Sequence, residues 1–432
     1  MGRTSTISRA ARARMRISST GSRTSRWCAS STLTALLLAA GVSVPLAAQS
    51  PRVVRSTEPP AWGSAVRLIP EMHIGEVDGE EAYLLGRVRS VAIGKGGAVI
   101  IADDKTPILR LYDARGTFVR DIGRSGEGPG EYRSMGGVRA LPDGRILLWD
   151  NRIQRLTYYT AAGAVIKSVR VPSGLFAADL FQVDSAGFAY VRAVTGAVAN
   201  DGNWLFGWIR VSPEGHVVDT IAVPRDERPA DTFVLSGASG YDRPFSRAYV
   251  STMSSQGLLL FGENTTYAFE LRRSGKPVTR IERAYSAVLI VGDERREWEA
   301  WSRYFTDMQR TPLTNSQVAP SAPVRVKVYV IPREKPAFSE LHSDTDGRIW
   351  VRRYVAAISR PGDERKPGDK RPRRVWKEQP TFDVFESSGR FLASVTLPWN
   401  ARFEDAKGMS LWLTVTGELG EERVARYRME AR

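Results

Sequence analysis

Apolar and other residues alternate along most of the chain, in short runs that end at turn glycines. Two runs show this most clearly: "KGGAVIIADDKTPILRLYDARGTFVRDI" begins at Lys95, and "PDGRILLWDNRIQRLTYYTAAGAVIKSV" begins at Pro142. Alternation with a period of two, bounded by glycine turns, is typical of β-strands that bury one face. The pattern therefore predicts antiparallel strands joined by tight turns.

These two runs are copies of one repeat, because they align without a gap at an offset of 47 residues. Gly97 aligns with Gly144, and Gly116 aligns with Gly163. The pattern returns in less regular form, with turn glycines at Gly187 and Gly215, at Gly257 and Gly275, at Gly347 and Gly389, and finally at Gly408. This gives six units, of which the last is one strand short.

A strand that can complete the last unit lies before the first one. The segment "AVRLIPEMHI", residues 65–74, has no strand beside it in the sequence with which to pair. If the units are four-stranded sheets arranged radially, pairing this strand with the C-terminal sheet closes a ring, and closure removes open sheet edges. The sequence thus predicts an all-β, six-bladed β-propeller over residues 65–432, whose last blade is built from the N- and C-terminal strands.

The glycine-rich part of the repeat resembles a known family. "GRSGEGPGEYRS", beginning at Gly123, and "LPDGRILLWDNRIQRLTYYTAAG", beginning at Leu141, resemble the bacterial six-bladed β-propeller proteins related to NHL-repeat proteins. The resemblance covers residues 86–172 and implies a propeller fold and an exported setting, within a family of diverse functions. Because Pro129 removes an amide donor and no Gly-Lys-Ser/Thr follows, we expect the glycines to turn the chain between blades and not to hold a phosphate.

Two segments interrupt the repeat. Residues 293–310 have aromatic and apolar side chains at helical spacing, namely Trp298, Trp301, Tyr304, Phe305 and Met308. They predict one inserted amphipathic helix that packs on the propeller, with a partner-binding helix as the alternative. Residues 352–376, "RRYVAAISRPGDERKPGDKRPRRVW", predict a basic, solvated loop. The alternative is an anion-binding flap, because clustered arginines suit carboxylates and phosphates.

The N-terminal residues differ from the rest of the chain. Seven arginines and no acidic residue precede an apolar stretch from Leu33 that ends in small residues, which is the pattern of a secretory signal peptide. The stretch of roughly 16 residues, broken by Pro45, is short for a membrane span of about 20. We predict a signal peptide over residues 1–49, a linker over 50–64, a periplasmic or secreted protein, and no membrane span in the mature chain.

Cleavage of this leader changes the composition of the protein. The formal charge falls from +15 to +8, and the only cysteine, Cys28, is removed. The mature chain then has no disulfide, and its stability depends on burial and on sheet hydrogen bonds. Export also separates the protein from nucleic acid, so the remaining positive charge indicates a diffuse attraction to anionic polysaccharide or lipid. We expect a monomer.

Ligand sites of propellers generally lie at the central channel, on the innermost strand of each blade. That strand precedes the turn glycine, and alternation directs the residues five and seven positions before the glycine toward the channel. Among the residues at these positions we select Arg139, Gln182, Thr252, Glu340 and His342. They are the candidate ligand-binding residues, although polar side chains can also line a water-filled channel without binding anything.

Two functions fit these candidates. The first is a non-catalytic binding or scaffold module that recognises a small molecule, a glycan or a protein at the channel mouth. The alternative is a lactonase-like hydrolase or lyase in which His342 and Glu340 form an acid–base pair, with Arg139 beside them. The three histidines and the inner carboxylates do not converge in the expected fold, so we predict no metal site and no cofactor.

Overall fold

The computed structural model describes residues 50–171, 181–195, 206–223, 244–310, 329–360, 368 and 370–431. These residues belong to the second of two compact units, Ser50–Arg432. The expected signal peptide, residues 1–49, lies outside the described residues.

Six antiparallel sheets form the blades of a β-propeller, as the repeat predicts. Blade one consists of β3 (Val88–Ile93), β4 (Val99–Asp103), β5 (Ile108–Tyr112) and β6 (Phe118–Ile122). Blade two consists of β9 (Gly137–Ala140), β10 (Ile146–Asp150), β11 (Arg155–Tyr159) and β12 (Val165–Arg170). Blade three consists of β13 (Phe181–Val183), β14 (Ala189–Val194), β15 (Phe206–Val211) and β16 (Val217–Ala222). Blade four consists of β17 (Tyr249–Met253), β18 (Leu259–Glu263), β19 (Ala268–Arg273) and β20 (Lys276–Glu282). Blade five consists of β21 (Phe338–Ser343), β22 (Ile349–Arg353), β25 (Thr381–Phe385) and β26 (Phe391–Thr396). Blade six consists of β27 (Ala401–Lys407), β28 (Ser410–Thr416), β29 (Glu422–Ala431) and β2 (Val66–Ile74).

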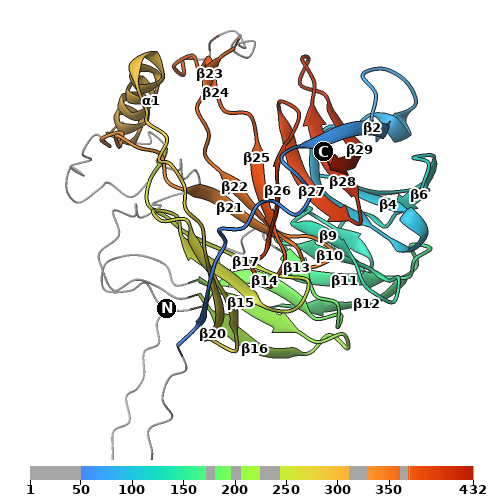
Figure 1. The fold of residues 1–432 in the computed structure, drawn as a ribbon. Helices are drawn as coiled ribbons and strands as arrows, with labels where there is room; N and C mark the ends of the chain where they lie inside the picture. Colours follow the sequence, from blue (N-terminus) through green and yellow to red (C-terminus); the bar gives the residue numbers. More distant parts are fainter. Residues whose placement is uncertain are drawn as a thin grey trace, which may run out of the picture. The chain divides into compact units, whose positions relative to one another are not determined.

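Strand β2 closes the ring, which confirms the predicted fold. It pairs antiparallel with β29, from Val66 opposite Ala431 to Ile74 opposite Val424, and becomes the outer strand of blade six. Figure 1 shows β2 beside β29, although the two strands lie at opposite ends of the described chain. The first strands of neighbouring blades contact one another from β27 through β3, β9, β13 and β17 to β21, so the inner strands surround the channel.

A further strand lies within the segment expected to be a linker. Strand β1 (Arg52–Arg55) pairs in parallel with β20 and becomes a fifth strand at the outer edge of blade four. The chain then reaches blade five, where the backbone amide of Trp62 donates to the carbonyl of Leu392 at 2.8 Å. Residues 50–64 are thus bound to two blades before β2 begins.

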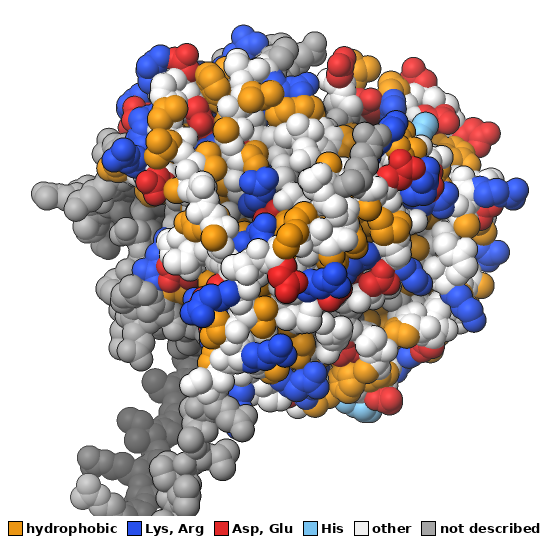
Figure 2. All heavy atoms as spheres, viewed as in Figure 1, with side chains coloured by type: hydrophobic (Ala, Val, Ile, Leu, Met, Phe, Trp, Pro, Cys, Tyr) orange, Lys and Arg blue, Asp and Glu red, His pale blue; other side chains and the backbone are white. Residues whose placement is uncertain are grey.

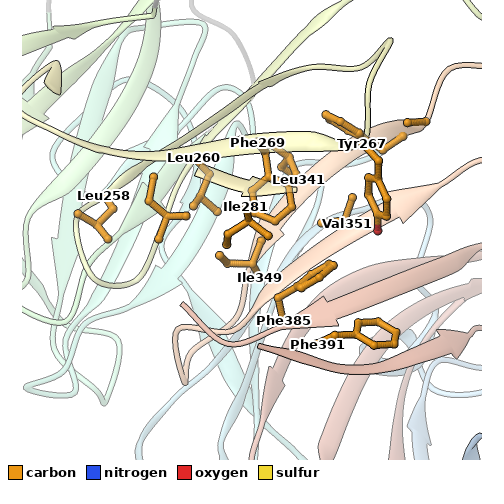
Figure 3. Close-up of a cluster of buried hydrophobic side chains, with 13 residues drawn as sticks. Leu258, Leu260, Tyr267, Phe269, Ile281, Leu341, Ile349, Val351, Phe385 and Phe391 are labelled. Carbon is orange, nitrogen blue, oxygen red and sulfur yellow. The ribbon is translucent and has the colours of Figure 1, made fainter. Parts of the chain in front are cut away.

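The hydrophobic core lies between neighbouring blades. Alternation gives each strand side chains on both faces of its sheet, and in a propeller both faces are covered by the adjacent blades. Figure 3 shows one such layer, in which Leu260 and Phe269 of blade four face Ile349 and Phe385 of blade five. Phe269 and Phe385 meet edge to face, with ring centroids 5.6 Å apart.

The glycine-rich segment joins the first two blades. It contains the short strands β7 (Arg124–Ser125) and β8 (Glu131–Tyr132), which pair in parallel. The hydroxyl of Tyr132 accepts a hydrogen bond from the amide of Leu109 at 3.1 Å and donates to the carbonyl of Ile122 at 2.9 Å, both in blade one. Gly123 adopts a φ of +67°, a conformation that favours glycine. The contacts of this segment are those of a tight connection between blades.

Helix α1 (Gly292–Arg310) is the inserted helix that the aromatic spacing predicts. Its Trp298 packs edge to face on Phe245, with ring centroids 5.0 Å apart, in a cluster that includes Ile290 and Ile331. The basic segment between β22 and β25 contains a second small sheet, β23 (Ile358–Ser359) paired with β24 (Trp376–Lys377). Figure 1 shows α1 and the β23–β24 sheet on the same side of the propeller.

The surface carries charges of both signs. Figure 2 shows Lys and Arg side chains spread over the visible face with Asp and Glu among them. Such mixing produces no single strongly positive patch on this face. In the described part of the chain, no helix combines the length and the hydrophobicity that crossing a lipid bilayer requires.

Candidate functional site

A cavity of about 330 Å³ lies where the inner strands converge. We call it the channel pocket. Three of the five candidate residues line it: Arg139 from blade two, Gln182 from blade three and His342 from blade five. The other lining residues are Arg89, Ser90, Val91, Ala92, Ile93, Gly136, Gly137, Ala140, Phe181, Val183, Ser255, Ser343, Asp344, Thr345, Arg402, Phe403, Glu404 and Asp405. Polar residues from different blades therefore share one small space.

Arg139 is held by its neighbours on both sides. Its Nε donates to Oε1 of Gln182 at 3.2 Å, and its Nη1 donates to Oγ of Ser90 at 2.9 Å and to the carbonyl of Val138 at 2.8 Å. The guanidinium lies 6.0 Å from the ring centroid of Phe181. Among the described residues, Nη2 has no hydrogen-bond partner. The guanidinium is thus fixed in orientation by hydrogen bonds from Nε and Nη1, which leave Nη2 available.

Two carboxylates of blade six face the same pocket. Burial lowers the pKa of Arg139, while the negative charges of Asp405 and Glu404 oppose that change. Burial likewise raises the pKa of Asp405, against hydrogen bonds from Thr345 and the charge of Arg139. Thr345 donates to Asp405 from its amide at 3.0 Å and from its hydroxyl at 2.6 Å. The pocket therefore presents both a cation and hydrogen-bond acceptors.

His342 and Glu340 form the pair expected from their spacing on one strand. Nε2 of His342 lies 2.9 Å from Oε2 of Glu340, and Arg352 donates from Nη1 to the other carboxylate oxygen. Burial favours a raised pKa for Glu340, but the hydrogen bonds and charges of His342 and Arg352 outweigh it and lower the pKa to about 2. Glu340 is therefore ionised near neutral pH and orients the imidazole, which packs against the rings of Phe382 and Phe403.

The other two candidates do not line the pocket. Thr252 on β17 has the expected inner-strand position, but its side chain is only 4% exposed. Glu340 pairs with His342 and Arg352 and is not among the residues that line the pocket. Arg139, Gln182 and His342 are thus brought together, whereas Thr252 and Glu340 stand outside the lining.

Sequence counting did not select the two acids of blade six. The count from Gly408 points to Phe403 and Ala401, because it assumes an unbroken alternation along β27. The structure has a register shift in β27 between Phe403 and Asp405, so Glu404 and Asp405 both reach the channel pocket. A bulge of this kind gives no clear signal in a single sequence.

The histidines lie on three different parts of the propeller. His73 lies on β2 at the outer edge of blade six, His216 follows the turn between β15 and β16, and His342 lies on inner strand β21. Within the described ranges, no group of three or more His, Cys, Asp or Glu side chains is placed to hold a metal ion.

Comparison with known proteins confirms the fold and the resemblance seen in the sequence. Residues 78–225 match the model of a protein family described as "6-bladed beta-propeller". No curated protein has a sequence that matches the chain. The solved structures that are similar have low sequence identity and therefore concern the fold alone.

Three of these structures illustrate the likeness. A member of the duf4221 family from Bacteroides vulgatus is 12% identical, with a TM-score of 0.48, over 85% of this chain and 99% of that one. Virginiamycin B lyase from Staphylococcus aureus is 10% identical, with a TM-score of 0.39, over 84% and 99%. A gluconolactonase from Xanthomonas campestris is 9% identical, with a TM-score of 0.39, over 83% and 98%.

Proposed function

We propose that this six-bladed β-propeller is an exported, non-catalytic binding protein that takes a small carboxylate-bearing ligand in the channel pocket. The observation that carries the proposal is Arg139, a guanidinium oriented by Gln182, Ser90 and Val138 whose Nη2 is left without a partner among the described residues. A fixed guanidinium with a free donor is suited to a carboxylate, which it binds through charge-assisted hydrogen bonds.

The size and charge of the pocket narrow the ligand class. About 330 Å³ lies near the lower end of the range for small-molecule pockets, roughly 300–1,000 Å³. Glu404 and Asp405 line the same pocket, so the ligand also needs hydroxyl groups that donate to them. A sugar acid has one carboxylate and several hydroxyls on a compact ring, and it is the class that we propose.

Calorimetric titration with galacturonate, and with galactose as the neutral control, tests the proposal. We expect galacturonate to bind and galactose to bind at least tenfold more weakly, because a hydrogen bond to a charged group contributes about 1.5–3 kcal/mol. Arg139→Gln removes the cation and should abolish this preference. Arg120→Gln, on the outer strand of blade one, is the matched control and should bind as the wild type does. Equal binding of the two sugars to the wild type would refute the proposal.

The contact between His342 and Glu340 supports one alternative, a hydrolase or lyase acting in the channel. An ionised carboxylate that orients an imidazole is a common arrangement for a general base. The two functions differ in the fate of the ligand. Under the binding proposal, NMR after long incubation shows galacturonate unchanged, and a sugar lactone opens no faster with the protein than without it. Conversion that is lost in His342→Ala would favour the enzyme.

A further inference from the structure

A second cavity, of about 620 Å³, lies between helix α1, the basic insert and the ends of blades five and six. We call it the helix–insert cleft. The residues that line it are Glu294, Trp298, Trp301, Ser339, Arg352, Arg353, Tyr354, Arg371, Pro372, Arg373, Arg374, Trp376, Lys377, Glu378, Gln379, Pro380, Trp399, Asn400, Ala401 and Arg402. Arg402 also lines the channel pocket. The cleft is thus a separate and larger space that meets the channel pocket at one residue.

Cationic and aromatic side chains dominate this cleft. Six arginines and one lysine line it, against two glutamates, and four tryptophans and one tyrosine lie among them. The two glutamates, Glu294 and Glu378, both pair with the buried Lys335, at 2.7 and 2.9 Å from its Nζ. Both acids of the lining are therefore paired with Lys335.

Several arginines of the cleft are held in place by ion pairs with acids outside its lining. Four are paired in this way: Arg352 with Glu340, Arg353 with Asp383, Arg374 with Glu297, and Arg402 with Glu404. These pairs fix the orientation of the guanidinium groups. Arg373 is exposed and has no contact of this kind among the described residues. Fixed donors lower the ordering cost of binding a ligand.

The two segments that border the cleft are joined to each other. The guanidinium of Arg374 stacks on Trp298, 3.6 Å from its ring centroid. Oε2 of Glu297 accepts a hydrogen bond from the amide of Val375 at 2.7 Å. Lys335, whose side chain is fully buried, pairs with Glu294 of α1 and with Glu378, which lies between β24 and β25. The cleft is thus formed in the free protein.

We infer that the helix–insert cleft binds an acidic oligosaccharide, a chain of uronic acid residues. Each uronate residue combines a carboxylate with a ring that has an apolar face. Arginines bind the carboxylates through paired hydrogen bonds, and flat indole rings pack on apolar faces. In the insert, Arg373 and Arg374 are followed closely by Trp376 and Lys377.

The aromatic side chains favour a saccharide over the other anionic ligands. An acidic peptide or an anionic membrane surface needs cations, but it does not need several indole rings within one concave space. The volume of about 620 Å³ is also enough for a ligand larger than the monosaccharide proposed for the channel pocket. This site is additional to the channel pocket and does not depend on it.

Titration of the protein with trigalacturonate, followed by calorimetry and tryptophan fluorescence, tests this inference. We expect trigalacturonate to bind, binding to weaken as salt rises, and maltotriose, its neutral counterpart, to bind at least tenfold more weakly. Arg373→Ala and Trp399→Ala should each weaken trigalacturonate binding about tenfold. Arg120→Ala on the outer strand of blade one is the control and should bind as the wild type does. Thermal melting of each variant establishes that it is folded.

Other outcomes overturn the inference. Equal binding of maltotriose excludes recognition of the carboxylates. Tighter binding of hexaglutamate identifies an acidic-peptide site, and binding of phosphatidylglycerol vesicles without trigalacturonate binding identifies a membrane-surface site. Arg139→Gln separates the two proposals, because it should leave trigalacturonate binding intact. Loss of trigalacturonate binding in Arg139→Gln, with Arg373→Ala unaffected, would place the ligand in the channel pocket instead.

Discussion

Ile74 offers a direct test of how the ring closes. It is the last residue of β2, is 1% exposed, and packs with Leu85, Val99 and Trp412 between blade six and blade one. The change Ile74→Ala removes three buried carbons, which costs about 2.4 kcal/mol at roughly 0.8 kcal/mol for each carbon. The cavity that remains adds to this cost, so we expect a loss of about 3–4 kcal/mol in the free energy of unfolding.

Urea unfolding monitored by circular dichroism measures this loss. The midpoint should fall while the slope of the transition is unchanged, because the surface exposed on unfolding is the same. The control is Arg67→Ala, an exposed position on the same strand, which should change the unfolding free energy by less than about 0.5 kcal/mol. If Ile74→Ala is no more destabilising than Arg67→Ala, β2 is not packed into blade six and the closure described above is wrong.

Three further changes test other parts of the structure. Gly123→Ala should cost about 2 kcal/mol or more in urea unfolding, because φ is +67° and the new Cβ would lie 2.5 Å from the carbonyl oxygen of Gly130; an unchanged midpoint would contradict this. Glu340→Gln should reduce stability at pH 7, and its deficit relative to the wild type should shrink as the pH falls from 4.5 toward 2, because the folded protein keeps the pKa of Glu340 at about 2. Urea unfolding at pH 7 and pH 3 measures this, and a deficit that does not change with pH would refute it. Lys335→Met leaves the carboxylate of Glu294 buried without its partner, so the free energy of unfolding should fall by about 3 kcal/mol or more and hydrogen exchange in α1 should speed up. Unchanged exchange in α1 would show that the ion pair of Lys335 with Glu294 does not hold the helix.

The fold could be predicted because each blade repeats the same local signals. Turn glycines such as Gly97 and Gly144 mark the ends of the inner strands, and alternation between them defines which residues face the neighbouring blades. The missing strand in the last unit then indicates where residues 65–74 must pair. Strand β1 gave no such signal, since its four residues pair in parallel with β20, which is more than two hundred residues away in the chain.

The channel pocket could be predicted in part. Counting back from the turn glycines selects Arg139, Gln182 and His342, because their strands keep an unbroken alternation up to the turn. In blade six the count selects Phe403, which lines the pocket, but it misses Glu404 and Asp405, which also reach the channel at the bulge in β27. The result is a pocket with more negative charge than the sequence indicates.

The helix–insert cleft could not be predicted from the sequence pattern. The amphipathic helix and the basic segment were each recognisable, and an anion-binding flap was one interpretation of the arginines. Their contact, between Glu297 and Val375 or between Trp298 and Arg374, joins residues that are widely separated in the chain. Local periodicity carries no information about such a contact.

A crystal structure of the protein soaked with galacturonate would show whether the channel pocket binds a sugar acid. We predict that the sugar lies in the channel pocket, with its carboxylate within hydrogen-bond distance of Nη2 of Arg139 and its hydroxyls directed to Glu404 and Asp405. A channel pocket that holds only water while Arg139 keeps its bonds to Gln182 and Ser90 would contradict it.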